Sequence, residues 1–243
     1  MILRSRRARK WTIVVASLLV VALAGAFTLL QVADSRTFQF FGTLVNRVDT
    51  SEKIVALTFD DGPDPAGTHA VLGTLDSRQV PATFFLVGRD IAAHPDLARD
   101  IAAAGHEIGN HSFSHDRMIG VTSSWVADEV EATDALIRTT GYRGEILFRP
   151  PHGKKLFALP RYLASHHRTT VTWDVDPDSA GTPDAATIER TTVEQVRPGS
   201  IVLLHAMYPA REPTRRALGP VLDALKQRGY RFVTVAQLLA ARR

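Results

Sequence analysis

The chain has 243 residues, of which 45% are hydrophobic and 22% are charged, and it contains no cysteine. This length and composition predict one globular domain with short additional segments, and they exclude a disordered or collagen-like chain. Without cysteine the protein has no disulfide bonds, thiolate metal ligands, cysteine nucleophile or lipoprotein anchor.

The positive net charge of +4 belongs to the N-terminus and not to the domain. Five of the 29 basic residues lie in the first ten positions: Arg4, Arg6, Arg7, Arg9 and Lys10. The rest of the chain has 24 basic and 25 acidic residues, so its positive and negative charges nearly cancel. We therefore predict no nucleic-acid partner.

Residues 11–32 carry no charge and are mostly apolar. As a helix, these 22 residues rise about 1.5 Å each and span about 33 Å, enough to cross the hydrocarbon core of a bilayer. The basic cluster before them would stay in the cytoplasm, which puts everything after Asp34 outside. A cleaved signal peptide is the alternative, because small residues at 22–26 offer cleavage sites.

We favour an uncleaved signal anchor, because the apolar run continues past both small-residue sites. The resulting plan has three parts. Residues 1–33 form a cytoplasmic basic tail and a single transmembrane helix, residues 34–50 form a linker, and residues 51–243 form the extracytoplasmic domain.

Short β-type segments alternate with helical patterns from Lys53 onward. The predicted strands are 53–59, 82–87, 106–109, 146–149, 170–175, 200–204 and 231–235. The predicted helices are 67–78, 90–103, 123–139, 155–166, 184–196, 213–228 and 236–242, and Gly105, Gly141 and Gly229 stand at expected C-caps. This alternation predicts an α/β fold of parallel strands with helical crossovers.

Polar residues follow the ends of several predicted strands: Asp60 and Asp61, His111, Arg149, Asp176 and Asp178, and His205. A doubly wound open sheet would scatter such residues along an edge, whereas a closed barrel brings all strand ends to one rim. We therefore favour a (β/α) barrel, with about seven parallel strands and outer helices.

Two adjacent carboxylates, Asp60 and Asp61, end the buried strand 53–59. Buried acids are costly unless a cation or an arginine compensates them; the alternative is a solvated turn rich in aspartate. His111 and His115 stand at i and i+4, and we expect them to face the same way on a helical turn. With one of the carboxylates they would make a two-His, one-Asp metal site that leaves positions open for water and substrate.

Four segments then occur in order: TFDDGPDP at 58–65, HEIGNHSFSH at 106–115, RPPHG at 149–153 and VLLH at 202–205. They resemble the successive motifs of the NodB-type polysaccharide deacetylases, carbohydrate esterase family four. The resemblance runs from about Lys53 to Leu239, so residues 51–243 would be the deacetylase domain. It implies a metal-dependent enzyme with a distorted (β/α) barrel.

The resemblance also implies a role for each motif residue. Asp60 would be the general base, paired with Arg149, and His205 the general acid. Asp61, His111 and His115 would hold the metal. The backbone N–H of His152 would help to hold the oxyanion, with Pro151 and Trp173 at the substrate; core packing is the alternative for Trp173.

The sequence departs from the family pattern at three places. The family commonly has tyrosine at His152, an aspartate at Ala206, and a D-x-x-D-W motif where this chain has Trp173-Asp-Val-Asp176-Pro-Asp178. We predict that Asp178 orients His205, with Asp176 as the alternative.

Together these features predict a membrane-anchored, metal-dependent deacetylase acting on N-acetyl groups of an envelope polysaccharide. Peptidoglycan is the first expected substrate, and chitin-like oligomers or acetylated xylan are alternatives. Zinc is the default metal, with cobalt, manganese or nickel as alternatives. An amidase on small amides or cyclic imides and a catalytically silent glycan-binding module are the rival functions. The sequence carries no signal for an oligomeric state.

Overall fold

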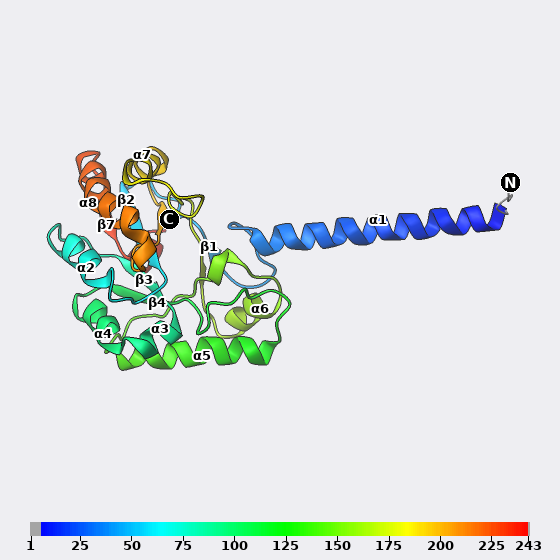
Figure 1. The fold of residues 1–243 in the computed structure, drawn as a ribbon, viewed down its shortest axis with the longest axis horizontal. Helices are drawn as coiled ribbons and strands as arrows, with labels where there is room; N and C mark the ends of the chain where they lie inside the picture. Colours follow the sequence, from blue (N-terminus) through cyan, green and yellow to red (C-terminus); the bar gives the residue numbers. More distant parts are fainter. Residues whose placement is uncertain (1–5, 243) are drawn as a thin grey trace.

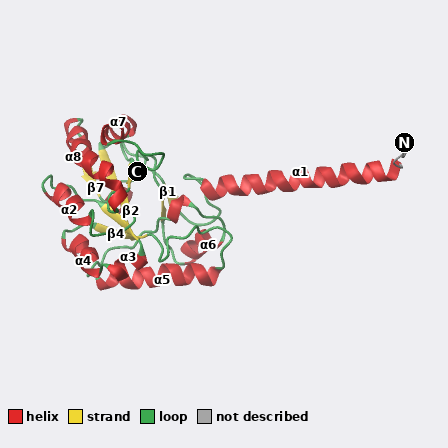
Figure 2. Cartoon of the chain, viewed as in Figure 1, coloured by secondary structure: helices red, strands yellow, loops and turns green. Residues whose placement is uncertain are grey.

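The computed structural model describes residues 6–242 and consists of an α/β domain with one long helix projecting from it (Figure 1). The strands are β1 (Leu44–Val45), β2 (Ile54–Asp60), β3 (Thr83–Leu86), β4 (Glu107–Asn110), β5 (Thr170–Val171), β6 (Ile201–Leu204) and β7 (Arg231–Val233). The helices are α1 (Arg6–Asp34), α2 (Thr68–Asp76), α3 (Gly88–Ala93), α4 (Pro95–Ala103), α5 (Ser123–Thr139), α6 (Ala158–Ser165), α7 (Ala185–Gln195), α8 (Glu212–Gln227) and α9 (Val235–Ala240). Figure 2 shows the helices surrounding the strands.

The pairings between these named strands are parallel, and β2 pairs with β3, β6 and β7. The main sheet runs β4-β3-β2-β6, and β7 pairs with the first half of β2. Single bridges continue the ring: Asn110 to Phe148, Phe148 to Thr170, and Val175 to Val202. The ring therefore returns to β6, so the α/β fold class is confirmed and the barrel is distorted where bridges replace strands.

Every residue of β2 is buried, because its two faces meet different parts of the core. Val55, Leu57 and Phe59 pack into the cluster under the outer helices. Ile54 and Ala56 pack into the barrel interior. Side chains alternate along a strand, so an unbroken apolar run fits a strand that is covered on both faces.

Each helix expected in the domain is present, with one break. The predicted helix 90–103 is two helices, α3 and α4, because His94 leaves the helical conformation and Pro95 starts a new helix. The C-cap glycines Gly105, Gly141 and Gly229 have φ values of 79°, 92° and 84°, a left-handed conformation that glycine adopts without strain.

Two strand predictions need correction. Residues 146–149 form no strand and contribute only the bridges of Phe148, and the strand expected at 170–175 is reduced to β5 and the bridge of Val175. Residues 34–50, expected to be a linker, contain β1, which pairs with β5. The segment thus packs on the domain, and the domain limits themselves stay a prediction.

Helix α1 contains Lys10–Asp34, a 25-residue and mostly apolar stretch of which residues 10–31 are exposed. It is long and apolar enough to cross a membrane, and a signal sequence would meet the same criterion. Arg4, the first residue of the basic cluster, lies outside the described residues.

Candidate active site

Strand β2 delivers two carboxylates to the rim of the barrel in different ways. Asp60, the last residue of the strand, is 2% exposed. Asp61 follows with a φ of 73°, so the chain turns and the second carboxylate leaves the strand direction. The two neighbours therefore face different partners.

Arg149 compensates the buried charge of Asp60. Its Nη1 donates to Asp60 Oδ1 at 2.6 Å and to the Thr58 hydroxyl at 2.7 Å, and its Nη2 donates to the Thr172 carbonyl at 3.1 Å. The guanidinium lies 4.1 Å from the centre of the Phe85 ring. Burial lowers the pKa of Arg149, although the charge and hydrogen bond of Asp60 oppose that shift. The pair fixes one Asp60 oxygen and leaves the other for chemistry.

His111 is oriented by the same segment. Its Nδ1 lies 2.7 Å from the Arg149 carbonyl oxygen, and since a carbonyl only accepts, Nδ1 carries the proton. Its Nε2 is therefore unprotonated in the neutral ring and points toward the carboxylates, 3.6 Å from Asp60 Oδ2 and 3.9 Å from Asp61 Oδ1. Burial lowers the pKa of His111 to about 4, which favours this neutral form.

The prediction of a helical turn for the histidine pair is wrong. Residues 111–115 form a loop with left-handed backbone at Ser112 (φ 64°) and His115 (φ 63°). The two rings still lie 4.9 Å apart. The loop thus reaches the arrangement that the i, i+4 spacing suggested, by a different backbone path.

Two buried side chains hold this loop, and sequence reasoning missed Glu129. Asn110 accepts from the Ser112 N–H at 2.8 Å and donates to the Val130 carbonyl at 2.9 Å. Glu129 on α5 accepts from the N–H groups of Phe113 and Ser114 at 2.9 and 2.8 Å. The sequence could have indicated Glu129 by its position, because it is a charged residue on the face of the predicted helix 123–139 that turns toward the core.

Asp61, His111 and His115 form a cluster of metal-ligand atoms that all lie within 4.8 Å of one another. His115 Nε2 is 3.1 Å from Asp61 Oδ1. Burial raises the pKa of Asp61, but the hydrogen bond of His115 and the charges of His111, His205 and His115 outweigh it and lower the pKa well below its usual range. One carboxylate and two imidazoles at this spacing fit the donor set of a divalent transition metal.

His205, just after β6, contacts Asp178 through two atoms. Its ring Nδ1 lies 2.9 Å from Asp178 Oδ1, and its backbone N–H donates to Oδ2 at 2.7 Å. Thr214 also donates to Oδ2, at 2.9 Å. Burial lowers the pKa of His205, but the hydrogen bond and charge of Asp178, with Asp60 and Asp61, raise it above its usual value.

Asp176 contacts different residues. Its Oδ2 accepts from Trp173 Nε1 and from Arg36 Nη2, both at 3.1 Å. Arg36, which lies just after α1, stands 4.9 Å from the centre of the Trp173 ring. Sequence reasoning missed Arg36, because nothing in its own neighbourhood connects it to the motif at 173–178.

The metal-ligand cluster, Asp60 and His205 line one cavity of about 330 Å³. Its lining is Arg36, Asp60, Asp61, His111, His115, His152, Trp173, Asp176, Ser179, Leu203, His205 and Arg211. Arg149 and Asp178 lie behind this lining, each against a residue that forms it. Pro151 is buried and does not line the cavity, whereas the His152 ring does, 4.7 Å from the His115 ring.

Comparison with known proteins assigns the family. The family model for polysaccharide deacetylase matches residues 47–171. The chain belongs to this family. The resemblance seen in the four motifs, to the NodB-type deacetylases of carbohydrate esterase family four, is thereby confirmed.

Known polysaccharide deacetylases match over most of the domain. A peptidoglycan-N-acetylglucosamine deacetylase of Bacillus cereus is 37% identical over 204 residues, covering 82% of this chain and 93% of the relative. A chitooligosaccharide deacetylase of Bradyrhizobium sp. is 35% identical, covering 76% and 90%. The structure of a family 4 acetyl xylan esterase from Clostridium thermocellum, in complex with a cobalt ion, has a TM-score of 0.72 at 34% identity, covering 77% and 91%.

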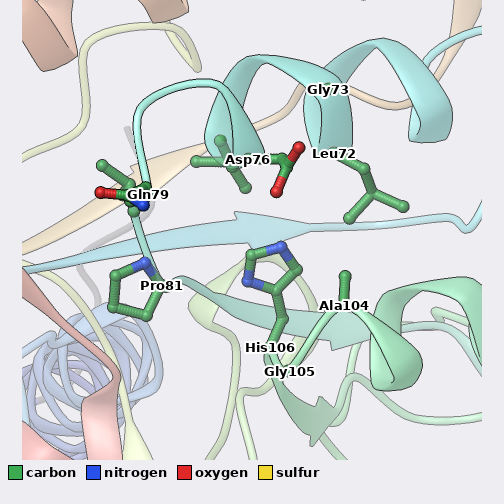
Figure 3. A pocket seen from close by; sticks show the side chains of 10 residues that line it. Leu72, Gly73, Asp76, Gln79, Pro81, Ala104, Gly105 and His106 are labelled. Carbon is green, nitrogen blue, oxygen red and sulfur yellow. The ribbon is translucent and has the colours of Figure 1, made fainter.

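A second cavity in this deacetylase-family domain, of about 400 Å³, shares no lining residue with the catalytic cavity. It is bordered by α2 and by the segments before β3 and β4, and Figure 3 shows the His106 ring beneath Asp76 at its wall. His106 Nδ1 accepts from the Ala82 N–H at 3.3 Å, as a neutral ring can. Burial lowers the pKa of His106 to about 4, against the opposing charge of Asp76. These features suit a buried packing histidine.

Proposed function

We propose that the protein is a metal-dependent carbohydrate deacetylase that removes acetyl groups from N-acetylated sugars of an envelope polysaccharide. One observation carries the proposal: a metal-ligand cluster, an arginine-paired carboxylate and a carboxylate-paired imidazole share a single cavity. Hydrolysis of an amide needs all three functions, an electrophile, a base and an acid.

Asp61, His111 and His115 would hold a divalent cation, with zinc as the default and cobalt, manganese or nickel as alternatives. Such a cation supplies Lewis-acid polarisation of the acetyl carbonyl and acidifies water. The fit rests on this chain's donor set: Nε2 of His111 is left free because Nδ1 is bound to the Arg149 carbonyl.

Asp60 is the base of the proposed reaction. Arg149 holds its Oδ1, so Oδ2 is the oxygen that accepts the proton of the attacking water. The water oxygen adds to the acetyl carbon while that proton moves to Oδ2. Because Arg149 is fully buried and fixed by three acceptors, it keeps the carboxylate aimed without a conformational change.

His205 is the acid. Asp178 binds its Nδ1, which leaves Nε2 as the atom that gives a proton to the sugar nitrogen as the C–N bond breaks. The pKa of His205, which the hydrogen bond and charge of Asp178 raise above its usual value, favours the protonated ring, and the free amine and acetate are the products. The backbone N–H of His152 would hold the oxyanion, with Trp173 lining the sugar subsite and Pro151 fixing the turn.

The substrate assignment rests on relatives and on α1. A relative 37% identical to the chain is a peptidoglycan-N-acetylglucosamine deacetylase, and α1 is long enough to anchor the domain beside the cell wall. Peptidoglycan is therefore the first substrate to test, with chitin-like oligomers and acetylated xylan as alternatives. We infer that α1 is retained as a signal anchor, with the basic end in the cytoplasm and the domain outside.

The test is acetate release by the full chain from a panel of acetylated glycans, with and without chelator. Asp60→Asn should lose nearly all turnover, because the base is removed, while metal content stays at one ion per chain. Acetate release that survives both the chelator and Asp60→Asn would contradict the proposal. Ammonia release or ring opening from small amides, without acetate, would favour the rival amidase.

A further inference from the structure

The end of α1 is fixed to the domain. Ala33 is fully buried, and its carbonyl accepts from the Lys155 N–H at 3.1 Å. Lys154 forms an ion pair with Asp34, and the Lys155 ammonium donates to the Ser35 carbonyl. The segment 154–155, just before α6, therefore holds the last turn of α1 in place.

The next residues reach the catalytic cavity at once. Arg36 lines that cavity, pairs with Asp176, and accepts from the Thr172 hydroxyl through its carbonyl at 2.6 Å. Two residues of chain span at most about 7 Å. The wall of the catalytic cavity therefore begins within about 7 Å of the end of α1, measured along the backbone.

An exposed aromatic patch lies beside the same junction. We define the patch as Phe38, Phe40, Phe41 and Phe157, which are 50%, 39%, 42% and 47% exposed. Phe40 stacks on Phe157 at 4.8 Å, and Phe38 contacts Phe40 edge-on at 5.6 Å. Among the residues whose burial the structure describes, every other exposed large hydrophobic belongs to α1.

The patch lies on the domain close to the end of α1. Phe38 is four residues beyond Asp34, and Phe157 is two residues beyond Lys155. Figure 1 places α6 on the side of the domain from which α1 leaves, and α8 on the far side. A hollow of about 390 Å³ beside the patch is lined by Phe41 and Phe157 and also by Arg161. Aromatic rings with nearby basic side chains are typical of the interfacial layer of a bilayer.

We propose that the aromatic patch binds the interfacial layer of the membrane that α1 crosses, and that this second contact holds the catalytic cavity at the membrane surface. The preferred substrate is then a glycan held near the bilayer, such as a lipid-linked N-acetylated saccharide. The substrate half of this inference rests on the proposed deacetylase function, and both halves use α1 as a retained anchor.

The membrane contact can be measured without any assay of activity. Because the chain has no cysteine, Phe38→Cys gives a single labelling site for a fluorophore in the full chain, reconstituted in phosphatidylethanolamine–phosphatidylglycerol vesicles. Gln227→Cys, exposed on far-side α8, is the matched control. Lipids that carry a quencher just below the headgroup should quench the label at position 38 and not at 227. A label at position 38 that is quenched no more than the control overturns the proposal.

The consequence for substrate choice is tested with the double variant Phe40→Ser, Phe157→Ser in the same vesicles. We expect acetate release from a lipid-linked saccharide to fall about tenfold, because the apolar contact that orients the domain is lost. Release from a soluble chitin oligomer should stay within about twofold, since neither residue lines the catalytic cavity. An equal fall on both substrates overturns the proposal, because it points to a glycan contact or a folding defect. If the unaltered chain releases acetate from neither, the proposed function fails, and the quenching result still decides the membrane contact.

Discussion

The catalytic cavity has two halves that are built in different ways. The metal half, Asp61 with His111 and His115, stands on the ends of β2 and β4 inside the matched family region, 47–171. The acid half, His205 with Asp178, lies beyond that region at the end of β6. Both halves line or support the same cavity, yet their supports differ.

The metal half depends on many small contacts. Its loop is held by Asn110, Glu129 and the Arg149 carbonyl, each from a different segment. The acid half depends on one carboxylate, since Asp178 accepts from both the ring and the backbone of His205 and from Thr214. Removing one support should therefore weaken the metal half gradually and the acid half abruptly.

The largest effect should come from the metal half when a ligand itself is replaced. We expect Asp61→Asn to lower acetate release by about a thousandfold or more, because the cluster loses its only anionic ligand and the electrophile with it. Metal content, measured by elemental analysis, should fall in parallel. Asp116→Asn, an exposed carboxylate just after the loop, is the control and should keep both. Full metal content with full activity in Asp61→Asn would remove Asp61 from the site.

The next largest effect should come from the acid half, as a change in the pH dependence of activity. Asp178 raises the pKa of His205, and the proposed acid must be protonated, so activity falls as pH rises through that pKa. In Asp178→Asn the pKa of His205 drops, the alkaline limb moves to lower pH, and turnover at pH 8 falls about a hundredfold. Metal content should not change.

Asp176→Asn is the matched comparison for that experiment. Asp176 contacts Trp173 and Arg36, not His205, so this variant should leave the alkaline limb in place. If Asp176→Asn shifts the limb and Asp178→Asn does not, the roles of the two carboxylates are reversed.

The two halves also differ in how much of their structure can be predicted from the sequence. The buried run that ends in Asp60 and Asp61 predicts a strand that delivers carboxylates to a rim, because periodicity and burial are local properties. The i, i+4 spacing of His111 and His115 correctly predicted that the two rings lie close together. The helical turn predicted between them is wrong, because residues 111–115 form a loop. Spacing does not distinguish a helical turn from a loop that contains left-handed residues, as Ser112 and His115 show.

Contacts between distant segments could not be predicted in this way. Arg36 meets Asp176 across 140 residues, and Glu129 meets the loop from another element. Strand β1 was missed because two residues that pair with a distant β5 carry no periodic pattern. In each case the stabilising contact is made with a residue far away in the sequence, which the local sequence pattern cannot identify.

A support of the metal half provides a smaller, graded effect. Glu129→Ala removes the acceptor of two loop N–H groups, so we expect metal affinity to fall about tenfold while the ligands remain. Titration with a competing chelator measures this change, and excess metal should restore most of the activity. Asp128→Ala, the exposed neighbour on the same helix, is the control. Activity that added metal does not restore would show that Glu129 does more than hold the loop.

The smallest effect on activity should come from the second cavity, which belongs to neither half. His106 is neutral in the fold because burial lowers its pKa to about 4, whereas in the unfolded chain it binds a proton near pH 6.5. The unfolded state therefore gains protons as pH falls from 6.5 to 4, and the folded state loses up to about 3 kcal/mol of stability over that window. Above pH 6.5 this contribution is constant.

His106→Asn keeps an acceptor for the Ala82 N–H and removes the titrating group, so urea unfolding at pH 7 and 4.5 should show a smaller pH dependence than in the unaltered chain. Turnover at pH 7 should stay within about twofold, because no catalytic group contacts this ring. An unchanged pH dependence of stability would mean that the acid sensitivity of the domain arises elsewhere.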